Sequence, residues 1–288
     1  MRSDADRLGV TERIGRIAHR FQLTDLRPAL PGALTNVFFG QTIGGDRIAL
    51  KVSSSRNSFE AEVEALRGFG DHRTARVRDA WLEEHAILLE RVEPGRALAY
   101  EATEDEAMRV AARLLSAGWP DAPSTTAAAA VATFDVSLER AIAGHDTGSC
   151  PVDLKLLQRA LAMFRELLDH EAEPVLLHGD LHYGNILSSD RAGYLLIDPK
   201  GYVGEAAFDV GYLVSRPSPP ARDALPLSKA IDRRLAFLPG ATGLDPHRVA
   251  AFAFVAAALS AAWAIEDDQP ACVYDEALSV LQDRTNRV

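Results

Sequence analysis

The chain has 288 residues, of which 47% are hydrophobic and 25% charged, and its formal net charge is −10. This length is enough for one or two domains with a buried core, and the composition excludes a disordered protein. The net negative charge argues against nucleic acid as a partner, because phosphate backbones require clustered lysine and arginine. It is compatible with a cationic substrate, and equally with an acidic surface that maintains solubility.

Neither a disulfide framework nor a membrane span is indicated by the residue pattern. Cys150 and Cys272 lie far apart and have no metal-ligand spacing, and the N-terminal residues lack the apolar stretch of a signal peptide. The uncharged segment 249–265 is short for a membrane span, and its bulky residues keep helical spacing. We therefore expect a cytoplasmic protein with no membrane partner, in which this segment is a buried helix.

Residues 1–93 predict a small β-rich lobe. Gly44-Gly45-Asp46 separates two apolar runs that are rich in β-forming residues, which is typical of a hairpin turn. The residues Pro94-Gly95 then indicate a break in the chain. The elements expected in this lobe are a helix at 5–21, strands at 35–43 and 47–53, a helix at 57–68 that ends at glycine, and strands at 75–82 and 86–92.

Residues 94–288 predict a larger, mainly helical lobe. The capping-box pattern from Thr103 to Glu106 opens a helix, and Asp153 is placed to cap a long amphipathic one. The other expected features are a loop or weak helix at 120–133, two short strands around the turn 188–193, and a final long apolar helix that begins at Asp245-Pro246. The fold class predicted is therefore α+β, with two lobes.

The motif with the most specific chemistry is His178-Gly179-Asp180-Leu181-His182-Tyr183-Gly184-Asn185. Asp180 and Asn185 are five residues apart, as in the catalytic loop of kinases, where the acid receives a hydroxyl proton and the amide holds Mg²⁺. Asp198 follows Tyr194-Leu195-Leu196-Ile197, a predicted strand, and a carboxylate at a strand end suits a second metal ligand. These three residues together predict phosphoryl transfer.

Lys51 is the candidate cation for nucleotide phosphates. It lies in Ile48-Ala49-Leu50-Lys51-Val52, an apolar strand in which a buried ammonium group requires a partner. Glu62 on the following helix is our candidate partner, with Glu60 and Glu64 as competitors. The alternative is an edge-strand lysine that points to solvent.

Supporting residues surround these positions. We expect His178 and His182 to have structural roles in the loop, Asp209 to accept backbone N–H groups from that loop, and Lys200 to contact either phosphate or a carboxylate. Glu266, Asp267 and Asp268 end the apolar helix, where the helix dipole disfavours negative charge. A cationic substrate, a nearby arginine or a solvated loop would each account for these three acids.

The sequence resembles the aminoglycoside phosphotransferase family, small-molecule kinases with a protein-kinase-like fold, and within it the streptomycin kinase and hydroxyurea phosphotransferase branch. The segments that carry the resemblance are 177–187, 196–201, 203–209, 88–92 and 243–263. The resemblance implies that ATP and Mg²⁺ are bound, with the adenine near backbone groups of Glu90 and Val92. It also implies Asp180 as catalytic base, Asn185 and Asp198 as Mg²⁺ ligands, and Lys51 on the phosphates.

Two departures from the family pattern concern the phosphate cover and the acceptor. Pro31-Gly32-Ala33-Leu34-Thr35-Asn36 stands where kinases have a glycine-rich loop, and Gly204-Glu205-Ala206 stands where relatives have Gly-Asp-Pro. The expected activity is ATP-dependent phosphorylation of a small-molecule hydroxyl, on a streptomycin-type aminoglycoside or hydroxyurea. Antibiotic resistance is associated with this family, and the sequence leaves open whether it is the biological role. A metabolite kinase acting on a sugar or amino alcohol, and a non-catalytic nucleotide-binding pseudokinase, are the alternatives. The pattern favours neither ATP over GTP nor any oligomeric state.

Overall fold

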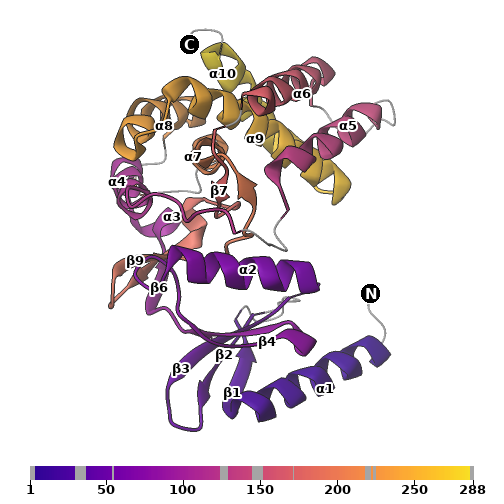
Figure 1. Ribbon diagram of the computed structural model, residues 1–288, viewed down its shortest axis with the longest axis vertical. Helices are drawn as coiled ribbons and strands as arrows, with labels where there is room; N and C mark the ends of the chain where they lie inside the picture. Colours follow the sequence, from indigo (N-terminus) through magenta and orange to yellow (C-terminus); the bar gives the residue numbers. More distant parts are fainter. Residues whose placement is uncertain are drawn as a thin grey trace.

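The structure is a computed structural model that describes residues 4–285 except 30–36, 54, 124–128, 145–151, 171, 218–221 and 223–224, and for residues 4–10 only the backbone. Its N-terminal part is a five-stranded antiparallel sheet with strand order β1-β2-β3-β5-β4 (Figure 1). The elements are α1 (Asp4–Phe21), β1 (Leu23–Pro28), β2 (Val37–Thr42), β3 (Arg47–Val52), α2 (Arg56–Phe69), β4 (Val77–Trp81) and β5 (Ala86–Glu90).

The two helices pack on opposite faces of this sheet because its side chains alternate. Ile48 and Leu50 of β3 belong to a core cluster with Ile17 of α1, whereas Ile87 of β5 packs with Phe59 of α2. Both predicted hairpins are confirmed, and β2, β3 and β5 pair in the register expected for antiparallel neighbours. In β3 this alternation turns Lys51 away from the α1 face, toward α2.

The N-terminal part differs from the sequence-based expectations at strand β1 and at the end of helix α2. Strand β1, which pairs with β2, has no counterpart among the predicted strands. Helix α2 does not end at Gly68 but continues to Phe69, and Gly70 forms its C-cap with a φ of 80°. Gly68 lies inside the helix where an added Cβ would come within 2.9 Å of Leu176, so close packing accounts for this glycine. The segment Pro31–Asn36 lies outside the described residues.

The C-terminal part is mainly helical, which confirms the predicted fold class. Pro94-Gly95 is not a simple break, because Pro94–Ala97 forms strand β6 and pairs with β8 beyond the catalytic motif. The sheets of this part are β6-β8 (Ile186–Ser189)-β9 (Gly193–Leu196) and β7 (Val175–Leu176)-β10 (Val203–Gly204). Its α-helices are α3 (Leu98–Glu101), α4 (Glu104–Leu115), α5 (Asp135–Ala143), α6 (Leu154–Asp169), α7 (Ala206–Ser215), α8 (Leu227–Thr242), α9 (Pro246–Glu266) and α10 (Asp275–Thr285).

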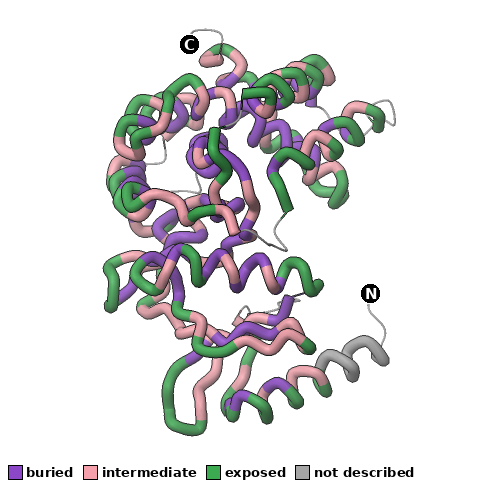
Figure 2. The backbone as a smooth tube through the Cα atoms, viewed as in Figure 1, coloured by how far each residue is buried: buried purple, intermediate pink, exposed green. Residues whose placement is uncertain are grey.

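Helix α9 is the centre of this core and packs against α5, α6, α7, α8 and α10 (Figures 1 and 2). Asp245 caps it by accepting the N–H of His247 at 2.8 Å, and Pro246 is its first residue. Among the described helices it is the one long and apolar enough to cross a membrane by length and composition, but 72% of its apolar window is buried inside the protein. The predicted buried helix is thus confirmed, although α10 follows it.

Helix α7 lies directly against α9, at a distance that only a glycine permits. A Cβ added at Gly211 would come within 2.7 Å of backbone atoms of Phe252 and Ala253. Every residue from Ala207 to Ser215 is buried, so α7 has no polar face that could reveal a helical period. Neither α7 nor α8 was predicted from the sequence.

A buried ion pair joins α8 to α4 and to the end of α7. Arg234 is 1% exposed and binds both carboxylate oxygens of Glu104, at 2.7 and 3.0 Å. Its Nη1 also donates to the carbonyl of Arg216 at 2.7 Å, where the last carbonyls of α7 lack helical partners. The hydroxyl of Tyr183, in the catalytic motif, donates to Glu104 at 2.9 Å. One buried pair therefore links three elements to the catalytic loop.

Glu104→Ala should destabilise the protein by about 3–5 kcal/mol, because it leaves the Arg234 guanidinium buried without its counter-charge. Urea denaturation gives the free energy of unfolding. The matched control is Asp105→Ala, which removes a half-exposed partner of Arg233 and should cost about 0–1 kcal/mol. Equal losses in the two variants would contradict a structural role of the buried pair.

Candidate active site

The catalytic motif is anchored by a carboxylate from α7. Asp209 is 0% exposed, and its two oxygens accept the backbone N–H groups of His178 and Gly179, each at 2.8 Å. The indole N–H of Trp119 donates to the same carboxylate at 2.9 Å. Burial raises the pKa of Asp209 to about 6, against the lowering effect of these three donors. The backbone before Asp180 is thereby fixed to the C-terminal core.

Gly179 is required by the conformation of this segment. Its φ is 78°, in the left-handed region that side chains with a Cβ rarely adopt, and an added Cβ would lie 2.5 Å from the ring of Tyr202. The loop therefore turns sharply immediately before Asp180.

His178 connects the catalytic motif to the strand that precedes Asp198. It is fully buried, its Nε2 lies 3.0 Å from the carbonyl oxygen of Ile197, and its Nδ1 accepts the N–H of Asp180 at 3.3 Å. These two contacts require the neutral tautomer that carries hydrogen on Nε2. Burial lowers the pKa of His178 to about 4, which agrees with a neutral ring.

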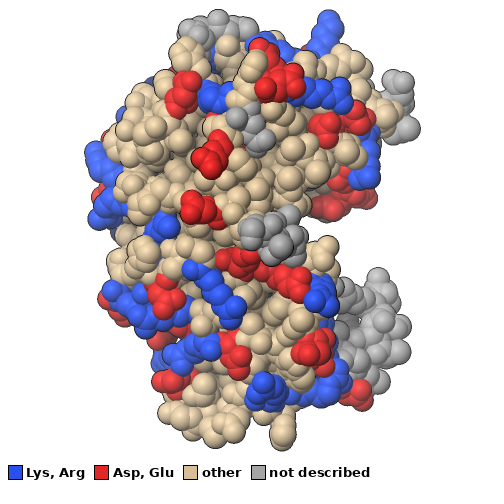
Figure 3. Space-filling model, viewed as in Figure 1, with Lys and Arg blue, Asp and Glu red and all other residues tan. Residues whose placement is uncertain are grey.

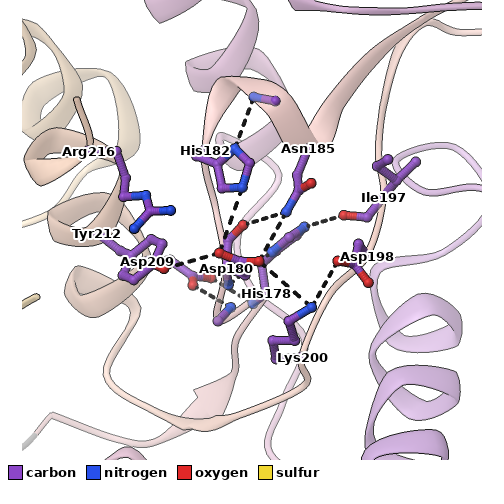
Figure 4. Close-up of polar contacts among 12 residues, drawn as sticks. His178, Asp180, His182, Asn185, Ile197, Asp198, Lys200, Asp209, Tyr212 and Arg216 are labelled. Atoms are coloured by element: carbon purple, nitrogen blue, oxygen red, sulfur yellow. Dashed lines mark hydrogen bonds and ion pairs between the residues drawn. The ribbon is translucent and has the colours of Figure 1, made fainter. Parts of the chain in front are cut away.

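Asp180 is surrounded by hydrogen-bond donors (Figure 4). The amide of Asn185 donates to its backbone oxygen at 2.9 Å and to Oδ2 at 3.3 Å, and the hydroxyl of Tyr212 donates to Oδ1 at 3.1 Å. Nε2 of His182 lies 3.8 Å from Oδ1, while its Nδ1 accepts the N–H of Gly184 at 3.0 Å. No pattern in the sequence indicates Tyr212, since a tyrosine within an apolar segment gives no signal of its own.

Asn185 and Asp198 present oxygen ligands of the kind that Mg²⁺ prefers. The Asn185 amide nitrogen is engaged with Asp180, so its carbonyl oxygen is the atom left for a cation. Asp198, with a φ of 57°, contacts Lys51 through Oδ1 and Lys200 through Oδ2, the latter at 2.8 Å. Although burial opposes ionisation, these two lysines lower the pKa of Asp198, and the carboxylate is ionised. The donor set fits a magnesium ion.

Glu62, rather than Glu60, is the acid that meets Lys51. Nζ of Lys51 lies 2.7 Å from Oε1 of Glu62, which is buried, and burial raises the pKa of this glutamate. Glu60 pairs instead with Arg56 one turn earlier, at 2.8 Å. Helix α2 thus directs one of its acids at the sheet, and Lys51 bridges it to Asp198.

A cleft of about 810 Å³ lies next to this ion-pair network. Apolar side chains on both sides of it, including Ala49, Leu89 and Leu187, are suited to a flat aromatic group, whereas Lys51 and Lys200 suit an anion. Glu90, Arg91 and Val92 line it too, as do Asn185 and Asp198. Nζ of Lys200 also lies 3.7 Å from Oδ2 of Asp180, so the polar residues of the cleft adjoin that carboxylate.

The acids at the end of α9 are not part of this cluster. Glu266, Asp267 and Asp268 are exposed, and they are absent from the described residues that line the cleft. Oε1 of Glu266 lies 3.7 Å from Nη1 of Arg140, the nearby arginine that the sequence left as one alternative. Acidic and basic side chains are interspersed on the face shown in Figure 3, in keeping with a solvated surface.

Comparison with known proteins identifies relatives over most of the chain. The family model for aminoglycoside/hydroxyurea antibiotic resistance kinases matches residues 32–268. Streptomycin 6-kinase of Streptomyces glaucescens is 28% identical over 262 residues, which cover 90% of this chain and 84% of the relative. Hydroxyurea phosphotransferase of Kitasatospora aureofaciens is 27% identical over 271 residues, or 91% of this chain and 75% of the relative.

Solved structures with a similar fold include small-molecule kinases. Choline kinase LicA of Streptococcus pneumoniae has a TM-score of 0.68 at 14% identity, with 95% of this chain and 99% of that chain covered. A thermostable mutant of aminoglycoside phosphotransferase APH(4)-Ia, solved as a ternary complex with ADP and hygromycin B, has a TM-score of 0.62 at 16% identity, covering 93% and 97% of the chains. At these identities the likeness concerns the fold.

The neutral ring of His178 gives stability a specific pH dependence. Its pKa is about 4 when folded and 6.5 in its unperturbed state, so between these values the unfolded chain binds the extra proton. The wild type should therefore lose roughly 3 kcal/mol relative to His178→Gln as pH falls from 7 to 4. Urea denaturation across this range measures the difference, and parallel pH curves for the two proteins would contradict it.

Proposed function

The chain belongs to the aminoglycoside/hydroxyurea antibiotic resistance kinase family, and from this premise we propose that it transfers the γ-phosphate of ATP to a hydroxyl group of a small molecule. The observation that carries this proposal is the position of Lys200, whose ammonium group contacts Asp198 at 2.8 Å and lies 3.7 Å from Asp180. A carboxylate suited to a metal and a carboxylate suited to an acceptor hydroxyl are therefore neighbours at the cleft.

In this proposal the nucleotide occupies the cleft, with the adenine against its apolar side chains and the backbone of Glu90 and Val92. Lys51, held by Glu62, contacts the phosphates, where its charge is close to the developing negative charge. Asn185 and Asp198 would hold Mg²⁺, which supplies charge neutralisation on the phosphate oxygens. Because Lys51 and Lys200 already pair with Asp198, both ammonium groups are positioned at the phosphate end.

Asp180 acts as the base of the proposed reaction. Tyr212 and the Asn185 amide orient its carboxylate, which then accepts the proton of the attacking hydroxyl. Burial raises the pKa of Tyr212 further above its ordinary value, so the phenol remains a hydrogen-bond donor at neutral pH. Phosphoryl transfer needs mainly positioning and electrostatic stabilisation from the protein. A carboxylate held in place by hydrogen-bond donors is therefore sufficient to position the hydroxyl and accept its proton.

Streptomycin-type aminoglycosides and hydroxyurea are the first acceptors to test, because the relatives named for them match 90% and 91% of this chain. Resistance to such a compound is the biological role that we propose. A choline kinase and an ethanolamine kinase share the fold at 14% and 10% identity, and a metabolite acceptor is the second candidate on that ground.

Asp180→Asn should lower kcat by roughly 10²- to 10⁴-fold, because the amide no longer accepts the hydroxyl proton. ATP affinity should stay within about twofold, since the nucleotide contacts are made by other residues; titration with a non-hydrolysable ATP analogue measures it. Asp190→Asn, an exposed acid in the β8–β9 turn, is the control. A wild type that binds the analogue but phosphorylates no hydroxyl compound would instead favour a pseudokinase.

Glu62→Gln should raise the KM for ATP and lower kcat, because Lys51 then loses the carboxylate that holds its ammonium group. The combined loss in kcat/KM is expected to be about 10- to 100-fold. Glu60→Gln is matched in chemistry and helix but affects only the pair with Arg56, so its kinetics should equal those of the wild type. Steady-state kinetics with varied ATP measures kcat and KM for each variant. Similar losses of kcat/KM in both variants would argue against the assignment of Glu62.

A further inference from the structure

Arg216 is an arginine beside the proposed base that the nucleotide chemistry does not use. It follows the last residue of α7, and its guanidinium lies over two aromatic rings, 5.1 Å from the centroid of Tyr212 and 5.7 Å from that of Tyr274. Nη1 donates to the hydroxyl of Tyr274 at 3.0 Å. The rings and the hydrogen bond fix the plane of the guanidinium, which is half-buried.

The charge of Arg216 is not matched by a carboxylate in direct contact. Within the described part of the chain, no Asp or Glu oxygen lies within 4.0 Å of it. Although burial opposes its charge, the neighbouring Tyr212, Tyr274 and Asp180 raise the pKa of Arg216 above its ordinary value, so the guanidinium stays charged. A guanidinium has five N–H donors, and the side-chain bond to Tyr274 uses one of them.

Arg216 and Lys200 lie on opposite sides of Asp180 (Figure 4). Lys200 lines the nucleotide cleft, whereas Arg216 does not. Tyr212 contacts both Asp180 and Arg216, because its hydroxyl donates to Asp180 while its ring faces Arg216. If the nucleotide approaches from the side of Lys200, the acceptor hydroxyl meets Asp180 near Arg216.

We propose that Arg216 binds the acceptor by donating hydrogen bonds to an oxygen atom next to the reacting hydroxyl, and that it thereby selects neutral or anionic acceptors. This inference rests on the proposed function. An acceptor with an ammonium or guanidinium group at that position would place two cations side by side, and the single carboxylate of Asp180 cannot neutralise both. Arg216 is thus a specificity-determining residue, and it opposes a cationic acceptor, which was one of the three explanations considered for the acids at the end of α9.

The two candidate acceptors differ in this respect. Hydroxyurea has a carbonyl oxygen next to its N-hydroxyl group, which matches a guanidinium donor. The 6-hydroxyl of streptomycin is on a ring that carries guanidino groups, one of them adjacent. Glycolate and ethanolamine form a second, smaller pair, in which a carboxylate or an ammonium group neighbours a single hydroxyl.

The test compares phosphorylation of these four compounds by the full-length wild type, Arg216→Gln, Arg216→Lys and Tyr274→Phe, with ATP and Mg²⁺. Arg216→Gln should raise the KM for the oxygen-bearing acceptors by about 10- to 100-fold with a smaller change in kcat, because the contact is made on binding. Arg216→Lys should raise this KM less than Arg216→Gln does, because a lysine keeps the positive charge. Tyr274→Phe should raise the same KM several-fold, because the guanidinium loses its hydrogen-bond partner. In Arg216→Gln the activity on the cationic acceptors should rise relative to that on the oxygen-bearing acceptors.

The control for charge removal is Arg233→Gln, which replaces an exposed arginine of α8. Thermal unfolding of each variant detects misfolding. A wild type that prefers the cationic member of each pair, or an Arg216→Gln variant that affects both members equally, overturns the inference while the phosphotransferase activity stands. A wild type that phosphorylates none of the four compounds overturns the inference, whereas the proposed function fails only if a wider hydroxyl panel is inert as well.

Discussion

The hydrogen bonds from the loop backbone to Asp209 are the constraint on which the rest of the site depends. This carboxylate is buried at a cost, as its raised pKa indicates, and the N–H groups of His178 and Gly179 repay only part of that cost. In return, the segment that ends at Asp180 has a single position relative to the helical core. From there His178 extends the constraint to Ile197, so that Asp198 and Asp180 keep a fixed relation although 18 residues of sequence separate them.

The ion pairs continue this network into the N-terminal sheet. Lys51 contacts Glu62 and Asp198, and therefore connects β3, α2 and the segment that follows β9. On the other side, the Arg234–Glu104 pair connects α8 and α4 to Tyr183. Charged groups that are expensive to bury are in each case used at junctions between elements, where packing of apolar side chains alone would leave the relative position adjustable.

The sequence predicts the parts of this fold in which pattern and turn chemistry agree. Both hairpins, the Thr103 capping box and the Asp245-Pro246 helix start are of this kind, because each is determined by neighbouring residues. Helix α7 escapes prediction because burial on all sides removes its period. The partner of Lys51 could not be chosen among three acids at alternate positions, since only the packing of α2 on the sheet decides which one faces inward. Tyr212 reaches Asp180, and Arg216 reaches Tyr274, through tertiary contacts that leave no local signature. The acids at 266–268 are conspicuous in sequence yet remain at the surface.

The close contact of α7 with α9 has a consequence for how such an enzyme diversifies. Asp209 and Tyr212 are on the same rigid helix, which Gly211 holds against the backbone of α9. A mutation that shifted α7 to admit a differently shaped acceptor would also move Asp209, which holds the catalytic loop, and would therefore lower kcat. In the proposed function, a change in acceptor preference is therefore expected at a side chain beyond the end of α7, such as that of Arg216, whose replacement leaves the backbone of α7 in place.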